Sequence, residues 1–258
     1  MLDVLVRIPG IRRGELVDFF NRFVVMLRSK GGDIIRCYLP DTGSLARMMP
    51  AGTPVYYVYV IPRLGRFTNC DVVALGDVRS LILVDSRLPN IVFSKLIPRI
   101  FGDVDVSSGV TREVQVKAPF LWYRADFIIL GYGREPLVVE VKGVNYAENG
   151  VGLFPSAKSN RASLQLEALK FLVQRGGARS MLVFIALRGD VKIVRPNEKV
   201  DPKFASRLCS YRHLIEYRAY RVRGELRGST LFVYYDGEVP VDPCTQTYSV
   251  GQENFQER

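Results

Sequence analysis

Short apolar runs separated by turn-forming residues fill the first third of the chain. Lys30 and Asp33 flank two consecutive glycines, and this turn signal has apolar residues on both sides. The runs expected to form strands are residues 17–27, 34–39, 54–61, 70–75 and 81–84. Strands of this length and spacing predict a small OB-like β-barrel, which we place at residues 1–83.

Strands alternate with helices in the second part of the chain. Ala162, Leu166 and Leu169 recur at helical spacing and predict a helix over residues 159–174. The other expected elements are helices at 90–101, kinked or ended by Pro98, and 202–214, and strands at 112–117, 124–130, 137–142, 181–187, 216–223 and, at a sheet edge, 232–235. This order predicts a mixed sheet flanked by helices at residues 84–235, with a polar, frayed tail at 236–258. The chain is therefore expected to be a two-domain protein of the α+β or α/β class.

One of these apolar strands carries two charges. Residues 136–143 read Pro-Leu-Val-Val-Glu-Val-Lys-Gly, and side chains alternate along a strand, so Glu140 and Lys142 share a face. The preceding apolar run carries Asp126. Burying such groups is costly unless they hold a metal or a polyanion, which makes the three residues a candidate site.

The overall charge points to an anionic partner. The 258 residues hold 36 Lys and Arg against 26 Asp and Glu, a net charge of +10. Such an excess favours nucleic acid, or less often an anionic membrane surface, although charge alone also aids solubility. No apolar run approaches the roughly 18 residues that cross a membrane, so we expect a cytoplasmic protein. The excess of positive charge makes DNA the expected partner.

Basic and aromatic residues indicate where DNA would bind. Tyr38, Tyr57 and Tyr59 lie on expected barrel strands, where they either stack on bases or pack between strands. The candidate phosphate contacts are Arg12, Arg13, Arg22, Arg36, Arg63 and Arg66 in the barrel, and Lys158 and Arg161 near the acid pair.

The four cysteines are far apart in the sequence. Cys37, Cys70, Cys209 and Cys244 form no CxxC pair, which argues against a zinc site. We expect buried free thiols in a reducing compartment, and the alternative is that two of the four cysteines form one disulfide. His213 is the single histidine, and a packed or solvated role is expected for it.

The order of the elements and the charged residues resembles the PD-(D/E)xK nuclease core. Asp126, Glu140 and Lys142 match its motif, and Glu113 on the first strand supplies a further acid. Asp126 and Glu140 would bind Mg²⁺ or Mn²⁺ through oxygen, and the lysine would position water or stabilise developing charge. The alternative is a buried ion network that only ties strands together.

A wider set of motifs, in order, is similar to the sugar fermentation stimulation protein family over most of residues 13–223. The matching segments are Asn-Arg-Phe at 21–23, Pro-Asp-Thr-Gly-Ser at 40–44, Asp-Ser at 85–86 with Asn90, Glu-Val at 113–114, Asp-Phe at 126–127, Val-Glu-Val-Lys at 139–142, Phe-Pro at 154–155 with Ala157, Ser159 and Arg161, Asp-Pro at 201–202, and Ala-Tyr at 219–220. The resemblance implies an OB-like domain, a nuclease-like domain, DNA binding and a link to sugar (maltose) metabolism in bacteria.

Three positions depart from that family's pattern. Ser156 stands where the family usually has Asp, Ala162 where it has Gly, and Gln165 where it has His. These departures weigh against cleavage more than against binding.

Three hypotheses follow: a DNA-binding protein, without sequence preference, that has a metal-dependent nuclease site; a DNA-binding regulator without cleavage; and an enzyme acting on a small anionic substrate. A homodimer also remains open.

Overall fold

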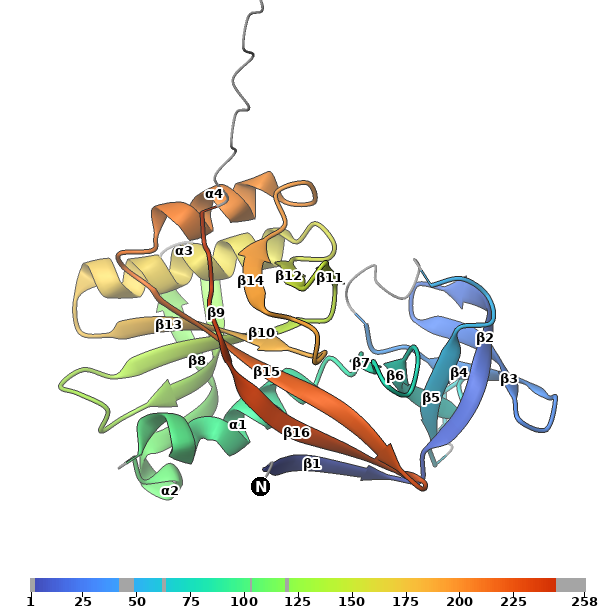
Figure 1. Ribbon diagram of the computed structural model, residues 1–258. Helices are drawn as coiled ribbons and strands as arrows, with labels where there is room; N and C mark the ends of the chain where they lie inside the picture. Colours follow the sequence, from blue (N-terminus) through green and yellow to red (C-terminus); the bar gives the residue numbers. More distant parts are fainter. Residues whose placement is uncertain (1–2, 42–48, 62–63, 103, 119–120, 245–258) are drawn as a thin grey trace, which may run out of the picture.

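The computed structural model describes residues 3–41, 49–61, 64–102, 104–118 and 121–244. A small barrel from the first third of the chain stands beside a larger sheet flanked by helices (Figure 1). Thr42 to Ser44 and Arg63 lie outside the described residues. Over the described residues, none of the helices is both long and apolar enough to traverse a bilayer.

The barrel consists of β2 (Arg12–Asn21), β3 (Val24–Ser29), β4 (Ile34–Tyr38), β5 (Pro54–Tyr59) and β6 (Cys70–Leu75), and β7 (Ile82–Leu83) pairs with β6. The strands pair antiparallel in the order β4-β3-β2-β5-β6, and a parallel pairing of β4 with β6 closes the ring. Leu27 and Cys37 are fully buried inside it. The predicted OB-like barrel is confirmed.

The run at 17–27 is two strands of a hairpin, and the expectation of one strand there is wrong. The chain turns at Arg22 and Phe23, between β2 and β3. The side chain of Asn21 accepts a hydrogen bond of 2.8 Å from the Phe23 backbone N–H, which is a local turn geometry that asparagine favours. The uninterrupted apolar character of the run concealed this turn.

The second domain is built on a seven-stranded sheet of order β1-β16-β15-β13-β10-β9-β8. Its strands are β8 (Val110–Ala118), β9 (Leu121–Ile129), β10 (Leu137–Val144), β13 (Arg179–Ala186), β15 (Glu216–Arg227), β16 (Thr230–Val239) and β1 (Val4–Pro9). Strands β10, β13 and β15 are parallel, and the remaining pairings are antiparallel. This is the expected mixed sheet.

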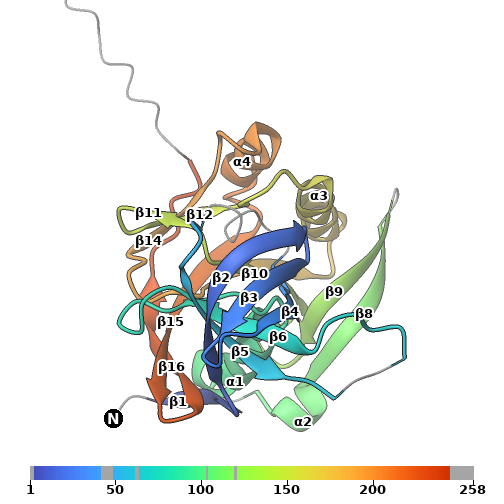
Figure 2. The same ribbon diagram turned by 90° about the vertical axis from the view of Figure 1, so that its right-hand side faces the viewer.

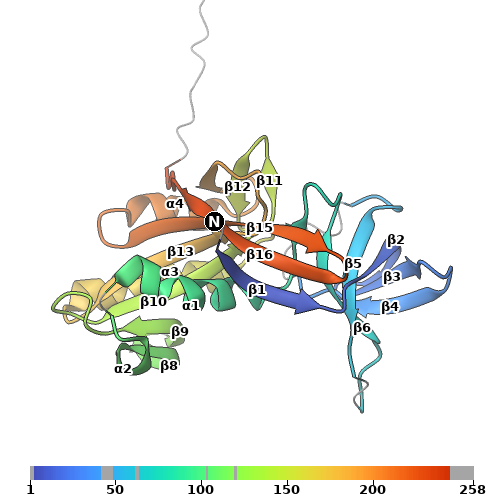
Figure 3. The same ribbon diagram turned by 60° about the horizontal axis from the view of Figure 1, so that its bottom comes forward.

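The two ends of the described chain meet in this sheet. Strand β1, expected within the barrel region 1–83, instead pairs with β16 as the sheet edge, so the segment 232–235 is not an edge strand. The two strands run with β15 toward the barrel (Figure 3). Residues 236–239 continue β16, and Val241 bridges Val194, so the tail expected at 236–258 begins in ordered structure.

All four cysteines are paired in disulfides, which corrects the expectation of free thiols. Cys37 and Cys70 join β4 to β6 where the barrel closes, and they are opposite each other in the ladder. Cys209 and Cys244 join α4 (Pro202–Ser210) to the segment after β16. Spacing along the sequence carried no sign of either pair, because strand pairing and chain return brought the partners together.

Helices cover both faces of the large sheet. On one face lies α1 (Leu88–Phe101), which contains Pro98, followed by the short α2 (Val106–Gly109). On the other lie α3 (Asn160–Arg175) and α4, capped by the side chains of Ser159 and Asp201. A small sheet of β11 (Ala147–Glu148), β12 (Val151–Phe154) and β14 (Ile193–Pro196) follows β10.

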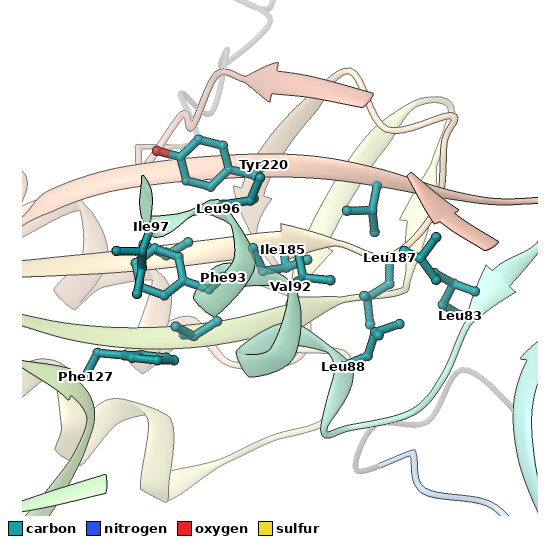
Figure 4. Packing of buried hydrophobic residues seen from close by; sticks show 14 of the residues in the cluster. Leu83, Leu88, Val92, Phe93, Leu96, Ile97, Phe127, Ile185, Leu187 and Tyr220 are labelled. Atoms are coloured by element: carbon teal, nitrogen blue, oxygen red, sulfur yellow. The ribbon is translucent and has the colours of Figure 1, made fainter. Parts of the chain in front are cut away.

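Two cores result, one on each face of the sheet. On the α1 side, Phe93 and Ile97 of α1 pack with Phe127 and Ile185 of the sheet (Figure 4). The same core includes barrel residues such as Tyr56, so the barrel and the sheet share one packed interior. The hydrophobic burial of this shared core holds the barrel against the ends of β10 and β13.

Candidate functional site

A cavity of about 390 Å³ lies where the barrel meets the carboxyl end of β10. The residues that line it are Arg22, Pro40, Asp41, Val84, Ser86, Pro89, Asn90, Asp126, Glu140, Val141, Lys142, Gly143, Asn145, Phe154, Pro155, Ser156, Ala157, Lys158, Ser159, Arg161, Ala162, Gln165 and Leu187. Most of the separate sequence motifs noted above contribute residues to this wall. Motifs scattered over 140 positions of the chain therefore meet at one place.

Glu140 is the buried centre of the site. Its side chain is 2% exposed, and its Oε1 accepts hydrogen bonds from Lys142 Nζ and Gln165 Nε2, each at 2.5 Å. Its Oε2 accepts one from the Tyr123 hydroxyl at 2.7 Å. Lys142 Nζ also donates to Gln165 Oε1 at 2.6 Å. Glu140, Lys142 and Gln165 thus form a closed triangle of charge-assisted hydrogen bonds.

The environment of Glu140 changes its titration. Burial raises the pKa of its carboxyl above the ordinary value of 4.5, the nearby Asp126 charge acts in the same direction, and Lys142 opposes both. Burial likewise raises the pKa of the Tyr123 hydroxyl well above its usual value, and the Glu140 charge adds to this. Tyr123 therefore stays protonated as a hydrogen-bond donor to Glu140.

Asp126 lies at a break in the pleating of β9. Its neighbours Ala125 and Phe127 would share a face on a regular strand, yet Ala125 packs in the α3-side core and Phe127 in the α1-side core. The carboxylate turns to the strand end, where Oδ2 accepts from the Val141 backbone N–H at 2.8 Å. Oδ1 accepts from Asn90 Nδ2 at 3.0 Å. This break brings Asp126 to the cavity.

A glycine allows α1 to reach the cavity. A Cβ on Gly143 would lie 2.8 Å from Cγ of Pro89, closer than real side chains approach. Because Gly143 has no side chain, the first turn of α1 can pack against β10 and present Asn90 to Asp126. The glycine after Lys142 is thus required by packing.

Glu113 is not among the residues that line the cavity. It lies on β8 with a positive φ of 52°, and its side chain is 65% exposed. Its carboxylate pairs with Arg124 at 3.5 Å instead of joining Glu140. The structure therefore brings together Asp126, Glu140 and Lys142 but leaves Glu113 beside them.

Cationic side chains border the cavity. Lys158 and Arg161 come from the segment around the first turn of α3, whose N-terminus carries a partial positive charge. Arg22 reaches the cavity from the β2–β3 turn of the barrel, with its guanidinium 5.2 Å from the centre of the Phe23 ring. Together with Lys142, these groups set four cations against the three carboxylates of the cavity wall, which are Asp41, Asp126 and Glu140.

The other barrel candidates lie away from the cavity. Arg12, Arg13 and Arg36 are exposed on the barrel, and Arg36 lies 5.1 Å from the centre of the exposed Phe20 ring. Arg66 pairs with Asp71 and is held in place. Among the tyrosines, Tyr57 is 2% exposed and belongs to the barrel core, whereas Tyr38 and Tyr59 are 38% and 56% exposed.

Sequence reasoning missed two parts of the site. Tyr123 was unmarked because an aromatic on an apolar strand indicates only packing, and nothing local points to its bond with Glu140. Asn145, after β10, donates to Asp41 of the barrel at 3.1 Å, and both side chains are buried in the cavity wall. Gln165 stood out only as a departure from a family pattern. Contacts between distant segments define all three roles.

The carboxylates retain acceptor capacity for a cation. A carboxylate offers about four lone-pair sites, and Asp126 accepts two hydrogen bonds while Glu140 accepts three. Across the described segments, no group of three or more His, Cys, Asp or Glu is placed to hold a metal ion. Two carboxylates suit Mg²⁺ and Mn²⁺ when waters and phosphate complete the coordination, so the residues present fit such an ion.

Comparisons with known proteins agree with this architecture. A family model described as "Sugar fermentation stimulation protein RE domain" matches residues 87–228, and one described as "SfsA N-terminal OB domain" matches residues 18–84. Relatives described as "Sugar fermentation stimulation protein homolog" include one from Moorella thermoacetica, 36% identical over 72% of this chain and 78% of the relative. Another, from Carboxydothermus hydrogenoformans, is 32% identical over 86% of this chain and 92% of the relative.

A solved structure is also similar over nearly the whole chain. It is described as "The structure of Pyrococcus Furiosus SfsA in complex with Ca2+", with a TM-score of 0.77 and 27% identity. The match covers 93% of this chain and 99% of that one. Because the large-domain family model alone matches more than half of the chain, the chain belongs to the sugar fermentation stimulation protein (SfsA) family.

Proposed function

We propose that this protein binds DNA without sequence preference and hydrolyses its phosphodiester bonds at the cavity between barrel and sheet. The observation that carries the proposal is the meeting of Asp126, Glu140 and Lys142 in a cavity that Arg22, Lys158 and Arg161 also line. Two acids with a lysine suit a phosphate diester held near a divalent cation. A purely structural ion network would have no need of an open cavity.

Asp126 and Glu140 would hold the cation. When bound, Mg²⁺ or Mn²⁺ polarises a phosphoryl oxygen and lowers the pKa of a coordinated water. The Ca²⁺ complex of the Pyrococcus furiosus relative supports a divalent cation in this family. Tyr123 and Asn90 would orient the two carboxylates, because each donates a hydrogen bond to one of them.

Lys142 is the group that would stabilise developing negative charge. Its Nζ lies 2.5 Å from Glu140 Oε1 and lines the cavity, where a phosphate would enter. Lys158, Arg161 and Arg22 would neutralise the flanking phosphates of the strand. Arg22 brings the barrel into this contact, so both domains would hold the same DNA segment.

A DNA cleavage assay tests the proposal. The full chain is incubated with supercoiled plasmid and with an end-labelled single strand, each in Mg²⁺ or Mn²⁺. Wild type should cut, and Lys142→Ala should lower the rate by about 100-fold or more, since removing one such stabilising group typically has that effect. Lys203→Ala, an exposed lysine on α4, is the matched control and should cut like wild type. Equal cutting by the Lys142→Ala variant would contradict the proposal.

DNA binding without cleavage is the second candidate, and one observation favours it. Lys142 Nζ already donates to both Glu140 and Gln165, so its charge is partly satisfied before any substrate arrives. Binding whose affinity falls steeply with salt, without products in either metal, would support this reading over catalysis. No binding to any DNA at low salt would contradict both.

A further inference from the structure

The hairpin of β8 and β9 continues beyond the main sheet as a two-stranded arm. The last ladder pair between β9 and β10 is Phe127 with Val139, and beyond it the two strands separate. Residues 113–118 of β8 and 122–126 of β9, here named the arm, remain paired only with each other. Figure 2 shows this hairpin rising beside α3, away from the rest of the sheet.

The two faces of the arm differ sharply. On the inner face, Tyr123 and Ala125 are buried in the α3-side core. On the outer face, Trp122 is 69% exposed, and Lys117 lies directly opposite it in the ladder. Arg124 follows on the same face, because side chains two apart on a strand point the same way. The outer face is therefore basic and aromatic.

One carboxylate, that of Glu113, offsets part of the positive charge of the outer face. Lys117 makes no ion pair with any described residue, and Arg124 pairs with Glu113 at 3.5 Å while both side chains are more than half exposed. Such an exposed pair contributes little to stability, although Glu113 still offsets one positive charge. Arg112, on the same side, donates to Ser94 and lies 5.7 Å from the centre of the Phe127 ring. Arg112, Lys117 and Arg124 thus give this side of the hairpin three cations against the one exposed carboxylate of Glu113.

The arm ends beside the cavity. Trp122 is four residues from Asp126 on the same strand, a separation of about 13 Å along β9 at the usual rise per residue. Asp126 itself lines the cavity. A strand of nucleic acid whose phosphate lies at Asp126 can therefore continue along the arm and reach Trp122.

We propose that the arm binds an unpaired DNA strand leading to the cavity, with one base stacked on Trp122 and its phosphates beside Lys117 and Arg124. This inference rests on the proposed DNA binding and adds the strand type and the contact surface. An exposed indole between cations offers a base both a π-face and charge complementarity for the backbone. A base inside a duplex is already stacked on its neighbours, so the surface suits a single strand.

Trp122 provides its own reporter, because it is the only tryptophan of the 258 residues. The full chain, in chelator to prevent cleavage, is titrated with a single-stranded oligothymidine, and tryptophan emission is followed. Saturable quenching is expected, since stacking places the base directly on the indole. A duplex of equal length should bind without comparable quenching, and equal quenching by the duplex would overturn the assignment to single strands.

Variants separate stacking from charge. By anisotropy of a labelled oligothymidine, Trp122→Ala should weaken binding by roughly 5- to 150-fold, the range typical of one stacked base. Trp122→Phe retains an aromatic face and should keep most of the affinity. Lys117→Ala should lower the salt slope by about 0.7, as expected for one lost phosphate contact, whereas Lys203→Ala on α4 should not. Because Trp122 and Lys117 are exposed, thermal unfolding should be unchanged in these variants.

Two results would overturn the arm proposal in different ways. If the wild type binds oligothymidine with unchanged emission and Trp122→Ala binds equally well, the arm is not the contact and the proposed DNA binding stands. If the wild type binds neither single-stranded nor duplex DNA at low salt, the proposed function fails and the arm proposal fails with it.

Discussion

Glu113 lies opposite Asp126 across the β8–β9 ladder. The pairs on either side, Arg112 with Phe127 and Val114 with Ala125, set this register, and no pair is formed at the position itself. Glu113 has a φ of +52°, a backbone conformation that residues other than glycine rarely adopt. The distortion on β8 coincides with the break in pleating on β9 that turns Asp126 to the cavity. Backbone strain thus accompanies the placement of a site residue.

Substitutions at Glu113 should separate backbone strain from side-chain chemistry. Glycine adopts positive φ without steric cost, so Glu113→Gly should leave the free energy of unfolding within about 1 kcal/mol of wild type. A β-branched residue is strongly disfavoured there, so Glu113→Val should lower it by about 1–3 kcal/mol. Urea unfolding measures both values. Equal stabilities of the two variants would show that the position is unstrained.

Metal affinity should depend on Asp126 and Glu140. Asp126→Asn and Glu140→Gln each remove a charged oxygen ligand but keep the side-chain shape, so Mn²⁺ affinity should fall at least about 10-fold without unfolding. Calorimetry with Mn²⁺ measures the affinity, and circular dichroism checks the fold. Glu113→Gln is the matched control, an acid on the neighbouring strand outside the cavity wall, and should bind Mn²⁺ like wild type. Unchanged affinity in the Asp126 and Glu140 variants would remove the metal site.

The raised pKa of Glu140 should appear in the pH dependence of stability. In metal-free protein, unfolding returns the carboxyl to its ordinary pKa of 4.5, below the raised folded value. Between the two values the folded state holds more protons than the unfolded state, so this group makes stability fall as pH rises through that window. Below the window and above it, the contribution is constant.

Glu140→Gln should remove this part of the pH dependence, because the amide does not titrate. Urea unfolding of wild type and variant across the acidic range, with chelator present, measures the difference. If the free energy of unfolding of wild type, relative to that of the variant, stays constant or rises with pH, the folded pKa is not raised.

The disulfide between Cys209 and Cys244 should stabilise the fold. It closes a loop with a sequence separation of 35, and a crosslink of this size raises the free energy of the unfolded chain by about 4 kcal/mol. Cys209→Ala with Cys244→Ala should therefore lower the free energy of unfolding by about that amount. Thiol titration under denaturing, non-reducing conditions should find no free thiol in wild type. Four reactive thiols would contradict both disulfides.

The alternation of side chains along a strand was enough to place Glu140 and Lys142 on one face, and the ion pair between them follows from that local rule. The barrel, the mixed sheet and the helix before Gly176 were likewise predictable, because periodicity and turn residues act over a few neighbours. The acid on the preceding apolar run added the expectation that Asp126 belongs to the same site.

Only the tertiary structure decided what surrounds that pair. Tyr123, Gln165 and Asn90 reach the acids from three different elements, and no local pattern records which distant side chains meet. The pairing of β1 with β16 and both disulfides also depend on long-range chain return. Local sequence determines whether a segment forms a helix or a strand and which of its faces is apolar. Packing of those faces against each other determines which polar groups share a cavity, because that outcome depends on the whole chain at once.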